Sequence, residues 1–311
     1  MRDWLKREPL VIASGEGALL RDVRGRKYLD ANSSIWTNLH GHQNPKINAA
    51  IRRQLKKIAH SSALGLANEP ASLLAQQLVE ATDNIHDSNE KSTCQSPIAN
   101  CKLEKVFFSD DGSTALEVAL KLAYEYTQRT RGKINSPKFL SLDGAYHGDT
   151  VGAVSVGHID LFHEAYSGLL FKTDKVMSPY CYRCPFNRAK PERADARQYH
   201  KCNWECVGLV EKKFTAQKRK GNSYAAFVFE PLMQGAAGMI PQPAGWLRRV
   251  TEIAREHGAL LIADEVMTGL GRTGVAVPVK AQAGPAGQPP FHKPGCKNLF
   301  ACQQENVQPD L

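Results

Sequence analysis

Residues 258–274 read GALLIADEVMTGLGRTG and place a short apolar run, residues 259–263, directly before two carboxylates, Asp264 and Glu265. A run of this length is typical of a strand that is buried on both faces of a parallel sheet. Ligands of open α/β sheets bind at the carboxyl ends of such strands, so we expect Asp264 to meet a ligand. The alternative is a carboxylate that caps the following turn or pairs with Arg272.

The chain before this stretch alternates short apolar strands with amphipathic helices. Strands are predicted at residues 105–108, 139–142 and 225–229. Helices are predicted after residue 113, at about 206–218 and at 244–257. The alternation indicates an α/β fold with a mainly parallel sheet, in which polar residues at the strand ends converge on one edge: Ser109, Asp143, Glu230 and Asp264.

The N-terminal residues have a different pattern. Residues 10–30 alternate short apolar pieces with turn glycines, which predicts antiparallel strands. Residues 33–42 have no clean period and predict a loop, while helices are expected at about 45–58 and 70–82.

Two stretches lack a hydrophobic period altogether. Residues 84–102 are polar and rich in Ser and Asn, and residues 275–298 are crowded with Pro, Gly and Ala. Both compositions predict irregular loops or insertions. An ordered pattern returns at residues 299–311.

The composition, 42% hydrophobic and 23% charged, is typical of a soluble globular protein. The N-terminus carries charges where a signal peptide needs an apolar core, and no apolar run approaches the length of a membrane span. We therefore expect a cytoplasmic protein without a membrane partner. The net charge of +9 is scattered, and its densest cluster, residues 212–220, is typical of a solvated helix end, so no nucleic-acid partner is expected.

Four of the eight cysteines form a C-x2-C pair, Cys181 and Cys184, and a C-x3-C pair, Cys202 and Cys206. This spacing is near that of a structural zinc site. The alternative is an irregular surface excursion whose thiols stay reduced in the cytosol. We favour the second interpretation and assign no metal ligand.

A predicted strand, a turn containing Gly112 and a predicted helix follow one another from residue 105 onward. The free N–H groups and the dipole at such a helix start favour an anion, Gly112 permits close approach, and Ser113 and Thr114 add hydroxyl donors. Simple N-capping by Ser or Asp is the alternative, and it is compatible with phosphate binding.

Tyr146 and His147 lie between glycines where the strand at 139–142 ends. Rings at that place can stack on a flat heterocycle and hydrogen-bond to it, although such a pair can also serve packing alone. Together with the phosphate cradle and Asp264, this platform suits pyridoxal 5'-phosphate (PLP), which needs its phosphate anchored, its ring sandwiched and its pyridine nitrogen held protonated. The glycine motifs of nicotinamide and nucleoside triphosphate sites are missing.

Six blocks of the sequence resemble the class III, fold-type I, PLP-dependent aminotransferases. They read SSIWTNLHGH (33–42), SDDGSTALEVALK (109–121), AYHGDTVGAVSVG (145–157), EPLMQGAAGM (230–239), DEVMTGLGRTG (264–274) and LFACQQENVQPD (299–310). The resemblance runs from about residue 3 to residue 311, apart from the two patternless stretches. It implies the PLP-dependent transferase fold, with a mainly parallel large domain and a small, incomplete α+β domain.

The resemblance also implies a division of the chain. Residues 1–60 would form the N-terminal part of the small domain and a linking helix. Residues 61–274 would form the large PLP-binding domain, with 84–102 as an insertion. After an irregular insertion at 275–298, residues 299–311 would be a truncated remainder of the large domain.

Carried over residue by residue, the resemblance implies a cofactor-binding group and a substrate-facing group. Gly112 and Ser113 would hold the phosphate, Tyr146 would stack on the ring, and Asp264 would bind the pyridine nitrogen. His147 adjoins the stacking residue and Glu230 lies beside the site. The substrate-facing group is Trp36, Tyr146 and Arg272.

The family's reactive lysine follows the QPD block, whereas this chain ends at Leu311. Lys280, Lys293 and Lys297 lie in the patternless stretch and match no family motif. Because that lysine bonds to the cofactor and shuttles the proton in transamination, we expect a fragment that does not transaminate as it stands, and we assign no catalytic residue.

Within the family, the blocks are most similar to members that act in biotin biosynthesis. The implied reaction moves an amino group from S-adenosylmethionine or lysine to the ketone of 8-amino-7-oxononanoate and gives 7,8-diaminononanoate, in a homodimer. One alternative is an ω-amino acid or diamine aminotransferase. Another is a non-catalytic binding or dimerising module, and a zinc-binding module is the weakest.

Overall fold

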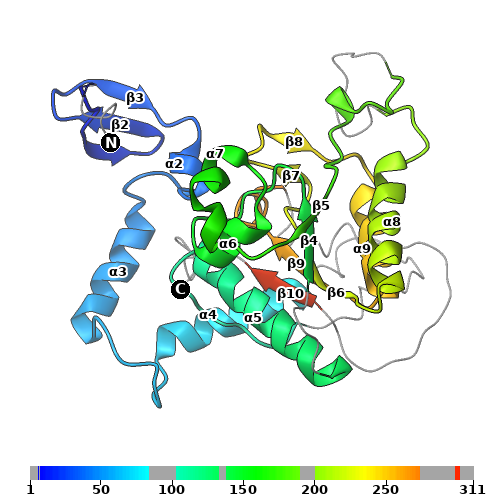
Figure 1. Ribbon diagram of the computed structural model, residues 1–311. Coiled ribbons are helices and arrows are strands. Elements are labelled where there is room, and N and C mark those ends of the chain that lie inside the picture. The colour runs from blue at the N-terminus through cyan, green and yellow to red at the C-terminus, as the bar shows by residue number, and fades with distance from the viewer. Residues whose placement is uncertain are drawn as a thin grey trace, which may run out of the picture. The chain divides into compact units, whose positions relative to one another are not determined.

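The computed structural model describes residues 6, 8–83, 103–132, 138–189, 200–273 and 298–301. The chain forms two compact units, residues 1–74 with 305–311 and residues 75–304 (Figure 1). The predicted insertion at 84–102 and nearly all of the one at 275–298 lie outside the described residues.

The N-terminal unit begins with a three-stranded antiparallel sheet of order β1-β2-β3, as predicted. Its strands are β1 (Ile12–Glu16), β2 (Leu19–Asp22) and β3 (Lys27–Leu29). The helices that follow are α2 (Ser33–Trp36), α3 (Pro45–Lys57) and α4 (Glu69–Asp83), of which α4 continues into the large unit. The predicted helices at 45–58 and 70–82 are confirmed, and the Asn44 side chain caps α3 by accepting a hydrogen bond of 3.0 Å from the Lys46 N–H.

The predicted loop at 33–42 was wrong in part, because α2 occupies its first residues. All of its residues, from Ser33 to Trp36, have a positive φ, so the turn is left-handed. Side-chain oxygens stabilise this unusual backbone. The Asp30 carboxylate accepts from the Ser34 N–H at 2.9 Å and from the Ser34 hydroxyl at 2.8 Å. No hydrophobic period signals such a turn, which explains why the sequence pattern missed it.

The large unit contains a five-stranded sheet of order β10-β9-β6-β4-β5, in which every pair is parallel. The strands are β4 (Lys138–Leu142), β5 (Asp174–Val176), β6 (Tyr224–Phe229), β9 (Leu260–Asp264) and β10 (Asn298–Ala301). The mainly parallel α/β fold is therefore confirmed. A short hairpin, β7 (Met233–Gln234) and β8 (Ile240–Pro241), lies outside this sheet.

Helices cover both faces of the sheet (Figure 1). Helices α5 (Gly112–Arg131) and α6 (Val151–Val156) pack on one face, and α8 (Glu205–Arg219) and α9 (Trp246–Glu256) on the other. The shorter pieces are α7 (Asp160–His163), η2 (Glu164–Leu169) and η3 (Cys181–Arg183). Within the described residues, no helix is long and apolar enough to cross a bilayer.

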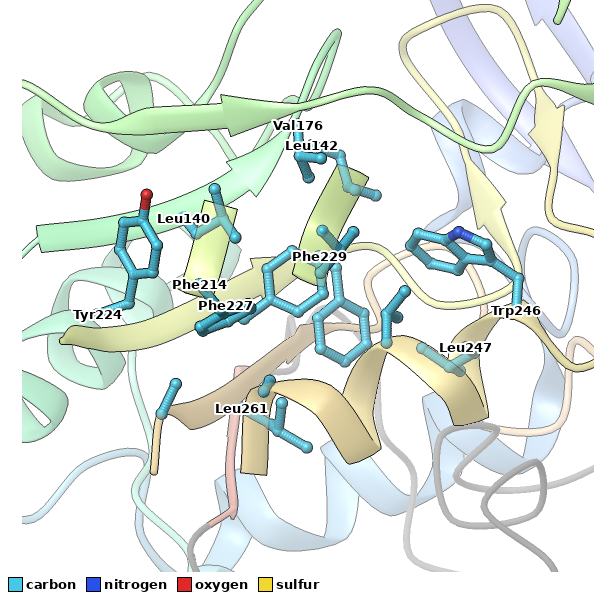
Figure 2. Packing of buried hydrophobic residues seen from close by; sticks show 14 of the residues in the cluster. Leu140, Leu142, Val176, Phe214, Tyr224, Phe227, Phe229, Trp246, Leu247 and Leu261 are labelled. Atoms are coloured by element: carbon cyan, nitrogen blue, oxygen red, sulfur yellow. The ribbon is translucent and has the colours of Figure 1, made fainter. Parts of the chain in front are cut away.

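The two central strands alternate their side chains between these faces. Phe227, Phe229 and Leu261 belong to the cluster packed against α8 and α9, which Figure 2 shows from close by. Val228 and Ile262 belong to the cluster packed against α5 and α6. All of these side chains are almost fully buried, and an interior packed on both sides holds the strand ends in fixed positions.

One predicted strand is absent. Residues 103–109 form no strand, and the Phe107 side chain is 68% exposed. A strand requires a neighbour that accepts and donates its backbone hydrogen bonds, and no described strand pairs with this segment. Conversely, β5, the β7-β8 hairpin, α6 and α7 were not predicted, since each is short.

Candidate active site at the edge of the parallel sheet

Asp264 is the last residue of β9, and its carboxylate contacts His147 from the loop after β4. The distance between Asp264 Oδ2 and His147 Nδ1 is 2.8 Å, and both side chains are buried. The other oxygen, Oδ1, accepts from the Val266 N–H at 3.1 Å. Asp264 therefore caps the following turn and binds a histidine, while Arg272 is exposed in a turn further on.

The surroundings of the buried His147 imidazole shift its pKa and leave one of its two nitrogens without a partner among the described residues. Burial alone lowers its pKa, but the hydrogen bond and charge of Asp264, together with the charge of Glu230, raise the pKa above its ordinary value. Its second nitrogen, Nε2, is buried and has no hydrogen-bond partner among the described residues. Buried polar atoms are nearly always satisfied, so this nitrogen has the capacity to bind one further polar atom.

Glu230 follows β6 and is 4% exposed. Its carboxylate accepts from the Gly235 N–H at 2.8 Å and from the Tyr146 N–H at 3.4 Å. Burial raises the pKa of Glu230 to about 7, although the charge of His147 and the two N–H groups lower it. The side chain thus joins the loop after β4 to the loop after β6, beside the Asp264–His147 pair.

The Tyr146 ring is half-buried and lies 5.2 Å from the Phe162 ring at a tilt of 53°. Its hydroxyl donates to Asp149 Oδ2 at 3.0 Å, and burial with this hydrogen bond raises the pKa of Tyr146 to about 12. Two contacts therefore fix the position of the Tyr146 ring.

The N-terminus of α5 approaches the same loop. Asp111 caps the helix through a 2.8 Å bond from the Thr114 N–H, in a capping box. A Cβ atom added to Gly148 would lie 1.8 Å from Ser113 Oγ, which shows how closely the chain after His147 passes the first turn. Capping, the alternative drawn from the sequence, is confirmed for Asp111, and it leaves the first N–H groups of the helix directed away from the helix body.

Gln234, at the end of β7, was missed by sequence reasoning. Its side chain is fully buried, and its Nε2 donates to the Asp143 carbonyl at 3.2 Å. Its Oε1 has no partner among the described residues. The only available signal was its place directly before Gly235 in a motif block, which does not distinguish packing from binding.

The fold brings some of the predicted site residues into contact and leaves others apart. The structure brings His147, Glu230 and Asp264 into direct or shared contact and places Ser113 against Gly148. Ser109 follows no strand, and instead its hydroxyl donates to the Thr114 hydroxyl at 2.7 Å at the start of α5. Trp36 belongs to the N-terminal unit.

These residues fit PLP on observations of the structure itself. A helix start with a glycine and a serine offers N–H and hydroxyl donors to a phosphate. A buried carboxylate hydrogen-bonded to an imidazole suits a protonated ring nitrogen, and the unpaired His147 Nε2 and Gln234 Oε1 provide further polar atoms. A parallel sheet with these groups at its edge matches the requirements of a PLP-dependent transferase.

Comparison with known proteins gives the family. The class III aminotransferase family matches residues 3–281, so the chain belongs to the class III aminotransferases, whose cofactor is PLP. Adenosylmethionine-8-amino-7-oxononanoate aminotransferase of Nitratidesulfovibrio vulgaris is 40% identical over 312 residues, covering 100% of this chain and 48% of that protein. The chain thus spans about half the length of such relatives.

Solved structures agree with this assignment. Adenosylmethionine-8-amino-7-oxononanoate aminotransferase from Methanocaldococcus jannaschii has a TM-score of 0.70 at 37% identity, covering 88% of this chain and 52% of that one. An amine transaminase from an uncultivated Pseudomonas species, in its PLP-bound form, has a TM-score of 0.72 at 29% identity, covering 89% and 56%.

Proposed function

We propose that this chain forms the cofactor-binding part of an aminotransferase of biotin biosynthesis. The reaction would transfer an amino group from S-adenosylmethionine or lysine to 8-amino-7-oxononanoate and yield 7,8-diaminononanoate. The observation that carries the proposal is the buried Asp264–His147 pair, in a chain that is 40% identical to a relative of that name.

The residues divide the binding of PLP among them. Gly112 and Ser113 hold the phosphate at the start of α5, and Tyr146 lies against the ring. Asp264 binds the pyridine nitrogen, and His147 orients the carboxylate from the other side. When bound, PLP supplies an electron sink for the amino-group carbon.

The charges of the site support this division. The raised pKa of His147 favours its protonated form, which places a positive charge 2.8 Å from the Asp264 carboxylate. An ionised carboxylate is what a protonated ring nitrogen requires. Glu230, whose pKa is raised to about 7, is partly neutral near neutral pH and therefore does not compete with Asp264 for that nitrogen.

Substrate recognition is assigned to Trp36, Tyr146 and Arg272. Tyr146 is half-buried next to the pair, and Arg272 is exposed beyond the end of β9, where an arginine can meet a substrate carboxylate. Trp36 stands in the left-handed turn α2, a backbone state that persists only where its surroundings impose it. A homodimer in the cytoplasm completes the proposal.

A second candidate is an ω-amino acid or diamine aminotransferase. The similar TM-scores of 0.70 and 0.72 do not separate the two solved relatives, because both share the fold. The identities of 37% and 29% favour the biotin-pathway enzyme. A third candidate, a non-catalytic binding or dimerising module, predicts no spectral response to any amino donor.

Titration of the purified chain with PLP tests the proposal, with cofactor absorbance as the readout. We expect saturable binding that Asp264→Ala removes and that Asp160→Asn, an exposed control in α7, leaves unchanged. Failure of the unmodified chain to bind PLP would overturn the proposal.

Adding candidate amines to the loaded chain then tests the substrate. A spectral change with S-adenosylmethionine or lysine supports biotin synthesis, whereas a change only with β-alanine or putrescine supports the second candidate.

A further inference from the structure

Between β5 and α8 the chain leaves the sheet in an excursion that carries cysteines on two arms. The first arm holds Cys181 and Cys184 around η3, and the second holds Cys202 and Cys206, the latter in the first turn of α8. Figure 1 shows this excursion, in green, beyond the N-terminal end of α8. All of these cysteines are free thiols.

Asn187 ties the two arms together. Its Nδ2 donates to the Cys181 carbonyl at 2.8 Å, and its Oδ1 accepts from the Lys201 N–H at 2.8 Å. A backbone hydrogen bond of 3.0 Å from the Arg188 N–H to the Lys201 carbonyl closes the same loop. The hydrogen bonds therefore place the residue before Cys202 next to the turn that bears the first pair.

The second arm is docked on the large unit. The Trp204 ring packs against the buried cluster beneath α8 and α9, and the Arg249 guanidinium lies 4.7 Å from its centre. The His200 ring lies 4.9 Å from the same indole. These contacts anchor the second arm, while the described residues of the excursion are irregular apart from η3, as the sequence predicted.

None of the thiols is fully exposed. Cys181 and Cys206 are buried, and Cys184 and Cys202 are half-buried. Cys181 and Cys206 each interact electrostatically with Cys184 and Cys202, so the four side chains form one group. Reactive cysteines need access to solvent, which the buried thiols lack.

We propose that Cys181, Cys184, Cys202 and Cys206 bind a zinc ion as a structural four-thiolate site. Two close pairs separated by a longer loop match the ligand spacing of structural zinc. Iron–sulfur motifs instead place three cysteines in one short run. A bound Zn²⁺ deprotonates its thiols and offsets the cost of burying them.

Metal binding must draw the thiols inward. Among the described residues, no group of three or more potential ligands is already close enough to hold a metal ion. Cys184 and Cys202 are half-buried, whereas Cys181 and Cys206 are buried and the Asn187 bonds hold the two arms together. A bound zinc ion would then fix the excursion, which has little hydrophobic core of its own, to the start of α8.

Elemental analysis of the full chain, purified without a polyhistidine tag, tests the site. We expect about one zinc per chain, as in closed structural sites. The variant Cys184→Ser/Cys202→Ser should retain less than about a tenth of that zinc. The matched control, Cys94→Ser/Cys101→Ser, alters two cysteines elsewhere in the sequence and should retain all of it.

Cobalt provides an independent readout of the ligands. Co²⁺ added to the metal-free chain should give intense thiolate-to-cobalt absorption, which the single variant Cys184→Ser should weaken even where the double variant fails to fold. Absence of zinc from the unmodified chain, iron in its place, or equal zinc in the Cys184→Ser/Cys202→Ser variant would each overturn the proposal.

Discussion

Two buried carboxylates, Asp22 in the N-terminal unit and Asp264 in the large unit, have opposite surroundings. Asp22 is 2% exposed and accepts from the N–H groups of Arg24 and Arg26 at 3.0 and 2.8 Å, from Arg26 Nε at 2.7 Å and from the Tyr28 hydroxyl at 3.0 Å. Every donor lies within six residues of Asp22 in the sequence. Asp264 instead binds His147, which is 117 residues away.

The difference sets a carboxylate bound only by its sequence neighbours against the one that we assign to the cofactor. The hairpin that contains Asp22 satisfies it completely by local bonds. The partner of Asp264, by contrast, keeps a buried nitrogen, His147 Nε2, without a hydrogen-bond partner in the described part of the chain. Other buried polar atoms of the large unit, Trp246 Nε1 among them, also lack a partner within the described residues, so the contrast rests on the long-range bond to His147 as well as on the unpaired His147 Nε2.

Removing the charge of Asp264 should have the largest effect. Asp264→Asn leaves His147 buried without its counter-charge, and breaking a buried pair in this way costs about 3–5 kcal/mol. PLP affinity should fall by at least about tenfold. Urea unfolding followed by circular dichroism and PLP absorbance titration measure the two effects.

The exposed control Asp160→Asn should change neither quantity. Should Asp264→Asn match this control in PLP affinity, Asp264 is a structural carboxylate like Asp22, and the contrast between them fails.

Glu230 should give the large unit a distinctive pH dependence. The pKa of Glu230 is raised from 4.5 to about 7, so the protonated form is favoured by folding. Its contribution to stability is then complete below pH 4.5 and is lost as the pH rises towards 7, by up to about 3 kcal/mol. The raised pKa of His147 acts in the same direction at higher pH.

The neutral variant Glu230→Gln removes the titrating group while keeping an acceptor for the Gly235 N–H. Its unfolding free energy, measured in urea at several pH values, should lose most of the decline between pH 4.5 and 7. An unchanged slope would show that Glu230 titrates normally.

Gly148 should be less tolerant than an ordinary loop glycine. Its φ is +114°, and an added Cβ would overlap Ser113 Oγ and crowd Ser113 Cα at 3.1 Å. Gly148→Ala should therefore destabilise the chain by about 1–3 kcal/mol and push the start of α5 away from the loop, which weakens PLP binding. Unfolding and PLP titration report the two effects separately.

The matched control is Gly208→Ala inside α8, where a Cβ meets nothing within 4 Å. There, alanine should stabilise the helix by about 0.5–1 kcal/mol. Equal behaviour of the two variants would mean that α5 does not depend on the close approach at Gly148.

Much of the site could be predicted from the sequence because its signals are local. An apolar run ending in Asp264, a glycine before a helix at Gly112, and an aromatic residue at a strand exit at Tyr146 are all visible in short windows. The fold class follows from the same windows, since the alternation of strand and helix leaves few topologies.

The remaining features depend on pairings that no window contains. The bond between Asp264 and His147 spans 117 residues, and the one between Gln234 and Asp143 spans 91. The predicted strand at 105–108 failed for a related reason, because strand formation needs a partner as well as apolar residues. The left-handed turn α2 depends on side-chain bonds from Asp30, which hydrophobic patterns do not report.

The smallest effect should come from Tyr28→Phe. Burial alone would raise the pKa of Asp22, but the bonds from Arg26, Tyr28 and Arg24 lower it below its ordinary value of 3.8. The stability that Asp22 contributes is thus present above pH 3.8 and is lost as the pH falls through the lowered pKa. Tyr28→Phe removes one donor and leaves the three from Arg24 and Arg26.

Hydrogen exchange of peptides from β1 to β3, measured while the pH is lowered, isolates this unit. Tyr28→Phe should exchange almost as slowly as the unmodified chain, whereas Asp22→Asn should exchange faster and lose the acid dependence. PLP affinity should stay unchanged in both variants. A Tyr28→Phe effect as large as that of Asp22→Asn would show that the local network is not redundant, and that Asp22 depends on a single critical partner much as Asp264 does on His147.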